Sequence, residues 1–187
     1  KSFKIPGTDL SLGIGGYVKV DAIQDFGAIG DAYEFKTNSI VVGDTAQGGR
    51  TTIHARETRL NLDLRSSGTG IRHFRAFVEG DFYGDGNAFR LRHGYGEFGP
   101  LLGGQTWSTF QDISARGLTV DFEGPDGEVF LRQAMIRFTQ KLSPHWTMAI
   151  AAENPTAQFG APSDMPGAAR ATMPDIPGFV RYERGRG

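Results

Sequence analysis

The sequence contains no cysteine among its 187 residues, which excludes disulfide frameworks, cysteine-ligated zinc, iron–sulfur clusters and thiol catalysis. No apolar run approaches the ~18 residues that a transmembrane helix needs, so a helical membrane protein is excluded. A membrane β-barrel is not excluded, because alternating strands keep mean hydropathy low, and here it is −0.32. An excess of basic residues is also lacking: the formal net charge is −1, which argues against a nucleic-acid partner.

The dominant pattern is the alternation of apolar and polar residues with period two, which predicts β-strands. In residues 88–98 the alternation places His93 and Tyr95 on the face opposite Arg90 and Arg92. In residues 129–140 Arg132 interrupts an otherwise apolar row. We expect strands over residues 10–22, 51–66, 72–83, 88–98, 101–110, 129–140, 145–153 and 178–183.

The connections between these strands alternate in length. Residues 66–70, 99–100 and 141–144 form short turns, whereas long connections cover residues 25–50, 111–128 and 154–177. A tight hairpin at Asp85 and Gly86 is the exception. Short turns at one end and long loops at the other are typical of outer-membrane barrels.

Alternation alone does not decide between a membrane barrel and a soluble β-sandwich, because each has one apolar and one polar face. The polar faces carry many charges of both signs, as the wall of a water-filled pore does. Aromatic residues lie at strand ends, such as Phe138 and Trp146 beside one short turn, which fits interfacial girdles. These features favour the barrel, and a sandwich binding module stays the alternative.

Three segments resemble the DcaP-like porins of Gram-negative outer membranes. The first barrel strand of that family is similar to residues 3–8, FKIPGT, followed by residues 15–21, GGYVKVD. The second strand resembles residues 56–61, RETRLN. The most specific similarity, to the fourth and fifth strands and their tight turn, covers residues 91–110, LRHGYGEFGPLLGGQTWSTF.

The resemblance implies an antiparallel, sixteen-stranded transmembrane β-barrel that assembles as a homotrimer in the outer-membrane lipid. The whole chain, residues 1–187, would be a single β-barrel domain truncated at its C-terminus, since it holds about half of such a barrel. The implied function is passive diffusion of small polar or anionic solutes such as dicarboxylates. A small eight-stranded barrel remains a rival, because ~8 strands can close around packed side chains.

Arginines on the polar faces are the candidate pore-lining residues. Guanidinium groups stay charged and bind carboxylates bidentately, and rings of Arg or Lys occur in anion-selective pores. The alternative is pairing within the wall, of Arg59 with Glu57 or Asp63 and of Arg75 with Glu79, which would cancel the selectivity. We predict anion preference and assign the solute pathway to Arg59, Arg65, Arg75, Arg90, Arg92 and Arg137.

The connection over residues 111–128 is rich in acidic side chains. The resemblance implies that this loop folds into the barrel and narrows it, which would place carboxylates opposite the wall arginines. The alternative is an ordinary solvated surface loop. The residues of this candidate constriction loop are Asp112, Asp121, Glu123, Asp126 and Glu128.

Catalytic and cofactor motifs are not found. The sequence has neither a Gly-x-Ser-x-Gly elbow nor a His-Glu-x-x-His motif, and its four histidines are scattered over different strands. The glycines of residues 13–16 lie in a strand with no helix after it, which rejects a dinucleotide loop. Residues 81–87 lack the glutamate of a calcium loop and fit a hairpin better. We therefore expect no enzyme, no cofactor and no metal site.

Overall fold

The computed structural model describes residues 2–27, 29–40, 42–43, 48–68, 73–115, 117, 119–120, 122–124, 127, 129–155 and 171–184. Its strands are β1 (Ser2–Lys4), β2 (Leu10–Tyr17), β3 (Asp21–Asp25), β4 (Arg50–His54), β5 (Arg59–Ser66), β6 (Phe74–Asp81), β7 (Arg90–Phe98), β8 (Leu101–Trp107), β9 (Arg132–Lys141), β10 (Trp146–Glu153) and β11 (Gly178–Tyr182). Short 3-10 helices are η1 (Thr37–Ser39), η3 (Asp85–Asn87) and η4 (Ile113–Ala115). None of the described helices is long and apolar enough to cross a membrane.

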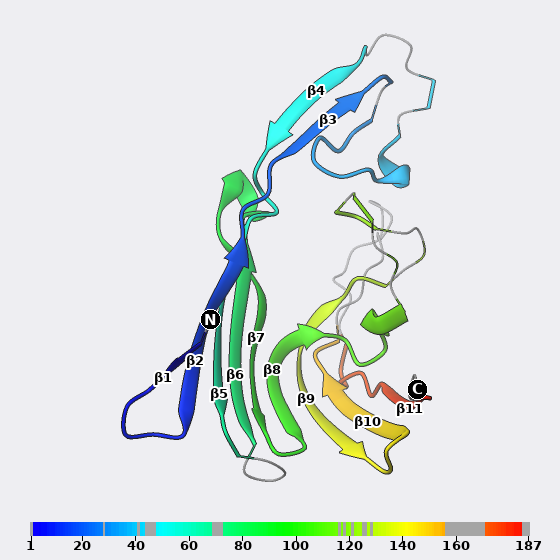
Figure 1. Ribbon diagram of the computed structural model, residues 1–187. Helices are drawn as coiled ribbons and strands as arrows, with labels where there is room; N and C mark the ends of the chain where they lie inside the picture. Colours follow the sequence, from blue (N-terminus) through cyan, green and yellow to red (C-terminus); the bar gives the residue numbers. More distant parts are fainter. Residues whose placement is uncertain are drawn as a thin grey trace.

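Nine strands form one antiparallel sheet in the order β1-β2-β5-β6-β7-β8-β9-β10-β11. Figure 1 shows this sheet curved into an open trough, with β1 and β11 at its two edges. The predicted antiparallel all-β fold is confirmed. Within the described residues the sheet does not close on itself, so a closed eight-stranded barrel is not what these strands form.

The burial of side chains is the reverse of that in a soluble sandwich. Leu60, Ile136 and Ile150 are 55, 68 and 50% exposed on the convex face. On the concave face Asp81 and Glu153 are 0 and 1% exposed. An apolar face left open and a charged face enclosed are expected when lipid surrounds the sheet and water fills the space inside it, so the barrel is favoured over the sandwich.

Two strands expected to be continuous are interrupted. Residues 10–22 divide into β2 and β3, and residues 51–66 divide into β4 and β5, where Thr58 N–H donates to the carbonyl of Ala55 in a turn. At Gly16 the φ angle is 136°, and an added Cβ would overlap the backbone of Arg59. β3 and β4 pair only with each other and project beyond the end of the main sheet (Figure 1). Because both halves keep the alternation, the pattern could not reveal the break.

A β-bulge in β7 corrects a second expectation. The register passes from Gly80↔Leu91 to Glu79↔His93, so Arg92 is the extra residue. His93 and Tyr95 therefore share the concave face with Arg92 instead of lying opposite it. The His93 Nδ1 atom is 3.0 Å from Thr106 Oγ1 on that face. The bulge breaks strict period two, which is why the sequence pattern placed these side chains wrongly.

Candidate functional site

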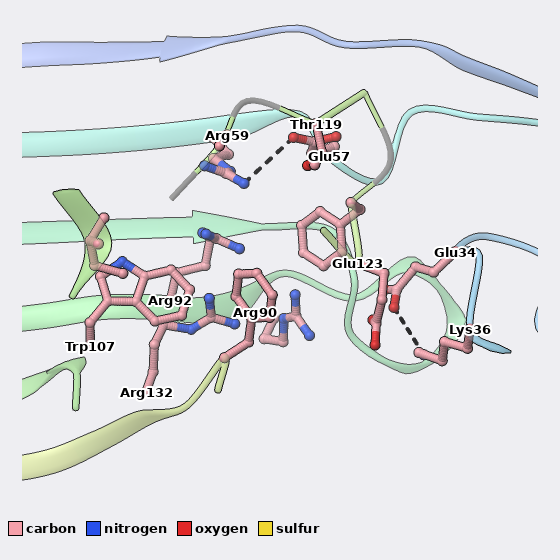
Figure 2. Close-up of a pocket in the computed structure, with 14 residues that line it drawn as sticks. Glu34, Lys36, Glu57, Arg59, Arg90, Arg92, Trp107, Thr119, Glu123 and Arg132 are labelled. Atoms are coloured by element: carbon pink, nitrogen blue, oxygen red, sulfur yellow. Dashed lines mark ion pairs between the residues drawn. The ribbon is translucent and has the colours of Figure 1, made fainter. Parts of the chain in front are cut away.

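A cavity of about 540 Å³ lies on the concave face, near the end of the sheet from which the β3–β4 hairpin projects. Four arginines from three strands line it: Arg59 from β5, Arg90 and Arg92 from β7, and Arg132 from β9. Figure 2 shows Arg92 and Arg132 beside Trp107 at the end of β8, whereas Arg59 lies nearer to Glu57. The sheet order brings these residues together, because β7, β8 and β9 are consecutive neighbours and only β6 separates β5 from β7.

Asp81 organises two of the four arginines. Its carboxylate, which is fully buried, accepts hydrogen bonds from Arg90 Nε at 3.0 Å and Nη2 at 2.8 Å. It also accepts one from Arg92 Nη1 at 2.9 Å and one from the backbone N–H of Tyr83 at 3.2 Å. Arg92 Nε donates to Glu79 Oε1 at 3.1 Å. Two carboxylates thus neutralise Arg90 and Arg92 and fix their positions.

Arg59 and Arg132 are less fully neutralised. Arg59 Nη2 lies 3.6 Å from Glu57 Oε1, but Glu57 is shared with Lys19, and the Arg59 Nε atom is buried without a hydrogen-bond partner. Arg132 stacks 4.6 Å from the Trp107 ring, and none of the carboxylates that the structure describes forms an ion pair with it. These two residues leave cationic donors available to an anion in the cavity.

The lysines near the cavity are held by carboxylates. Lys36 Nζ is 2.8 Å from Asp31 Oδ2. It is also 2.9 Å from Glu34 Oε2, an ion pair marked in Figure 2. Burial lowers the pKa of Lys36, but its hydrogen bonds to Asp31 and Glu34 outweigh burial, and the pKa lies above its ordinary value. Lys19 is bonded to Glu57 and lies 3.1 Å from Asp21. The less neutralised cations of the cavity are therefore arginines.

The six arginines assigned to the pathway do not form one continuous ladder. Arg59, Arg90 and Arg92 line the cavity, whereas Arg65 and Arg75 lie toward the short-turn end of their strands and share Asp63. Their Nε atoms donate to that carboxylate at 3.0 and 2.9 Å. The alternative of pairing within the wall therefore holds for Arg75, but its partner is Asp63 and not Glu79.

Arg137 is also separate from the cavity, since it pairs in register with Leu102 and Ala151 farther along β9. Its Nε atom is buried and without a hydrogen-bond partner. Arg132, in contrast, lines the cavity although sequence reasoning did not assign it to the pathway. The sequence did carry one indication of this role, since Arg132 interrupts the apolar row in residues 129–140.

The described residues of the loop after β8 reach both sides of the trough. Arg181 Nη2 on β11 donates to Asp112 Oδ1 at 2.6 Å. On the other side, Lys19 Nζ donates to the carbonyl of Val120 at 3.3 Å, and Phe122 stacks on Tyr83 with ring centroids 4.1 Å apart. The loop therefore crosses the concave side of the sheet.

Of the predicted constriction-loop acids, Glu123 lines the cavity and Asp112 is bound to the wall. Asp121, Asp126 and Glu128 lie outside the described residues. The narrowing of a pore by this loop stays a prediction.

Metal-binding geometry is not seen in the described part of the chain. No group of three or more His, Asp or Glu side chains there is arranged to hold a metal ion. The chemistry that the cavity offers is the binding of anions by guanidinium groups between aromatic rings.

Comparison with solved structures identifies an outer-membrane channel. The chain is similar to DcaP of Acinetobacter baumannii, an outer membrane channel, with a TM-score of 0.71 and 25% sequence identity. The match covers 95% of this chain and 50% of that one, so the chain spans about half the length of the channel. No protein-family model and no curated protein sequence matches the chain.

The likeness confirms the resemblance to DcaP-like porins and the assignment of the fold to about half of a porin barrel. The matched protein is an outer membrane channel, which fits the prediction of a role other than catalysis.

Proposed function

We propose that this chain forms about half of the wall of a porin in the Gram-negative outer membrane, through which small polar solutes diffuse passively and anions pass preferentially. The similarity to an outer membrane channel and the exposure of apolar side chains on the convex face support the porin role. Lipid would surround that face, two further copies of the chain would complete a trimer, and no step would involve bond chemistry.

The observation that carries the anion preference is the state of the cavity arginines. Asp81 and Glu79 neutralise Arg90 and Arg92, while Arg59 shares its carboxylate and Arg132 has no ion pair among the described residues. A carboxylate solute could accept hydrogen bonds there from groups already desolvated and held in place. Small dicarboxylates suit such a site, since Arg59 and Arg132 offer two separate points of attachment on different strands.

Reversal potentials in planar lipid bilayers, measured with the full-length protein in a KCl gradient, test this function. We expect chloride to be preferred over potassium, and Arg132→Gln to reduce the preference by removing the least neutralised charge. Lys141→Gln is the matched control, because it removes the same charge from the other end of β9, about 30 Å away at ~3.4 Å per residue. Cation selectivity of the unaltered channel would contradict the proposal.

Competition by a dicarboxylate tests the solute class separately. Succinate added to one side is expected to reduce the chloride current of the unaltered channel more strongly than that of Arg132→Gln. Equal reduction in both would show that Arg132 does not attract carboxylates. Native mass spectrometry of the detergent-extracted protein tests the trimer.

A further inference from the structure

The loop that crosses the trough begins with two residues that are almost completely buried. β8 ends at Trp107, and the next residues, Ser108 and Thr109, are 4 and 2% exposed. Ser108 N–H donates to the carbonyl of Leu131 at 2.9 Å, where the loop returns to β9. Such burial is unusual at the start of a long loop, which generally runs over the protein surface.

Both residues are held by Glu153, the last residue of β10. Ser108 Oγ donates to Glu153 Oε2 at 2.7 Å, and Thr109 N–H donates to Glu153 Oε1 at 2.7 Å. β9 lies between β8 and β10 in the sheet, so the bonds bridge an intervening strand. The chain leaving β8 is thereby directed across the concave face instead of continuing along the line of the strand.

Glu153 is itself fixed by its surroundings. It pairs in register with Met135 on one side, and on the other its backbone exchanges hydrogen bonds of 2.9 and 3.1 Å with Asp175. Thr109 Oγ1 also contacts Met135 Sδ at 3.8 Å. A carboxylate that is 1% exposed is costly to bury unless its oxygens are hydrogen-bonded. Here both oxygens bind the loop, so the loop and the carboxylate stabilise each other.

A second attachment, a few residues later in the loop, also ties the loop to the side of the sheet where β10 and β11 lie. Asp112 binds Arg181 on β11, one strand beyond β10, but half of the Asp112 side chain is exposed. Exposed ion pairs contribute little because water and salt screen them. The buried bonds of Glu153 therefore dominate the attachment of the loop.

We propose that Glu153 is a positioning residue that sets the path of the pore-crossing loop by binding Ser108 and Thr109, without contacting the solute. The inference rests on the proposed channel function only for its electrical readout. It names a residue outside the arginine cavity, and it assigns the loop's inward course to one buried carboxylate instead of to the acidic residues of the loop itself.

Hydrogen exchange of the full-length protein in detergent, followed by mass spectrometry of the peptide that contains Thr109, tests the attachment directly. In Glu153→Ala the Thr109 amide loses its acceptor, and we expect its exchange to be at least about tenfold faster, as loss of one hydrogen bond predicts. Glu153→Gln keeps an acceptor oxygen for this amide and is expected to restore most of the protection. Glu97→Gln, a control on the same face with the same change of charge, should leave this peptide unchanged.

Single-channel recording of the same variants provides the second readout. We expect Glu153→Ala to show a larger and noisier conductance, with Glu153→Gln close to the unaltered channel. If Glu153→Ala does not fold, Ser108→Ala removes one of the two bonds without changing a strand and should raise exchange and noise in the same direction.

Two results would overturn the inference: unchanged exchange around Thr109 in folded Glu153→Ala, or unchanged exchange and noise in Ser108→Ala. A protein without channel current would refute the proposed function instead, and the exchange measurement would still decide the role of Glu153.

Discussion

Replacing Asp81 with asparagine removes one negative charge from a fully buried position beside Arg90 and Arg92, two of the arginines that line the cavity. The substitution keeps the shape of the side chain and an oxygen that can accept the Tyr83 N–H. The charged groups that line the cavity, together with the two carboxylates bonded to Arg90 and Arg92, are equal in number: Arg59, Arg90, Arg92, Arg132 and Lys36 against Glu34, Glu57, Glu79, Asp81 and Glu123. The local net charge therefore changes from zero to one positive charge in Asp81→Asn.

The size of the effect follows from Coulomb's law. A monovalent ion passing about 6 Å from the added charge gains or loses about 0.7 kcal/mol in water, and roughly half of that remains after screening in 0.1 M salt. Since the anion gains and the cation loses, the ratio of their permeabilities should rise about threefold in Asp81→Asn.

Reversal potentials in a KCl gradient measure this ratio. Asp9→Asn is the control: it makes the same change at an exposed residue before β2, about 27 Å from the cavity end of that strand at ~3.4 Å per residue. The double substitution Asp81→Asn with Arg90→Gln restores the charge balance and should return the ratio to its original value.

Stability also responds, because Arg92 is 3% exposed and, among the residues that the structure describes, keeps only Glu79 as an ion-pair partner. Removing one partner from a buried pair costs about 3–5 kcal/mol, so the temperature of the heat-induced shift in gel mobility should fall. If folded Asp81→Asn has an unchanged or lower anion preference, or if Asp9→Asn has the same effect, the charge balance of the cavity does not set the selectivity.

Three further predictions concern the wall and the loop. Gly104→Ala should lower the free energy of unfolding in urea by about 1–3 kcal/mol, because φ at Gly104 is +131° and an added Cβ overlaps the Gly94 carbonyl. Gly103→Ala is the control and should be tolerated, because an added Cβ there meets open space. Equal losses in the two variants would contradict this reasoning. Ile136→Arg places a charge on the apolar face near the middle of β9 and should reduce folding into lipid vesicles by about 2–4 kcal/mol, whereas unchanged folding would argue against lipid contact. Hydrogen bonds from Ser114, and then the nearby arginine of β11, hold the pKa of Asp112 below its usual value. The contribution of the Asp112 carboxylate to the attachment of the loop is therefore complete above about pH 3.9 and is lost only as the pH falls through the lower folded pKa. Hydrogen exchange in residues 110–115, corrected for intrinsic rates, should therefore stay constant from pH 8 to 5. A rise in exchange within that range would contradict the prediction.

The local alternation of apolar and polar residues was sufficient to predict most strands and the two faces of the sheet. Leu60, Leu62 and Ile136 alternate with polar residues, and all three are exposed on one side. Side chains on a strand point to opposite faces in turn, so this outcome follows from period two alone. Arg59 and Arg90 lie on the charged face for the same reason, whereas Arg92 shares that face with His93 because it is the extra residue of the bulge.

Contacts between strands that are distant in the sequence decided where the strands are interrupted and where β7 has its bulge. The bulge at Arg92 depends on how β7 pairs with β6, and the interruptions at residues 18–20 and 55–58 depend on a hairpin whose strands keep the same alternation. Neither feature is marked by a change in composition or by a particular motif, so neither was predicted from the sequence.

The sequence by itself therefore determined strands with one apolar and one charged face, because alternation is a property of each strand alone. The lengths of the connections and the resemblance to porins, not the alternation, favoured the barrel. Only the tertiary structure decided which charges neutralise one another, that Arg132 joins the cavity, and that Glu153 holds the loop. Those outcomes depend on strand register and on carboxylates many residues away in the chain, and a one-residue change of register reverses the face of every side chain after it.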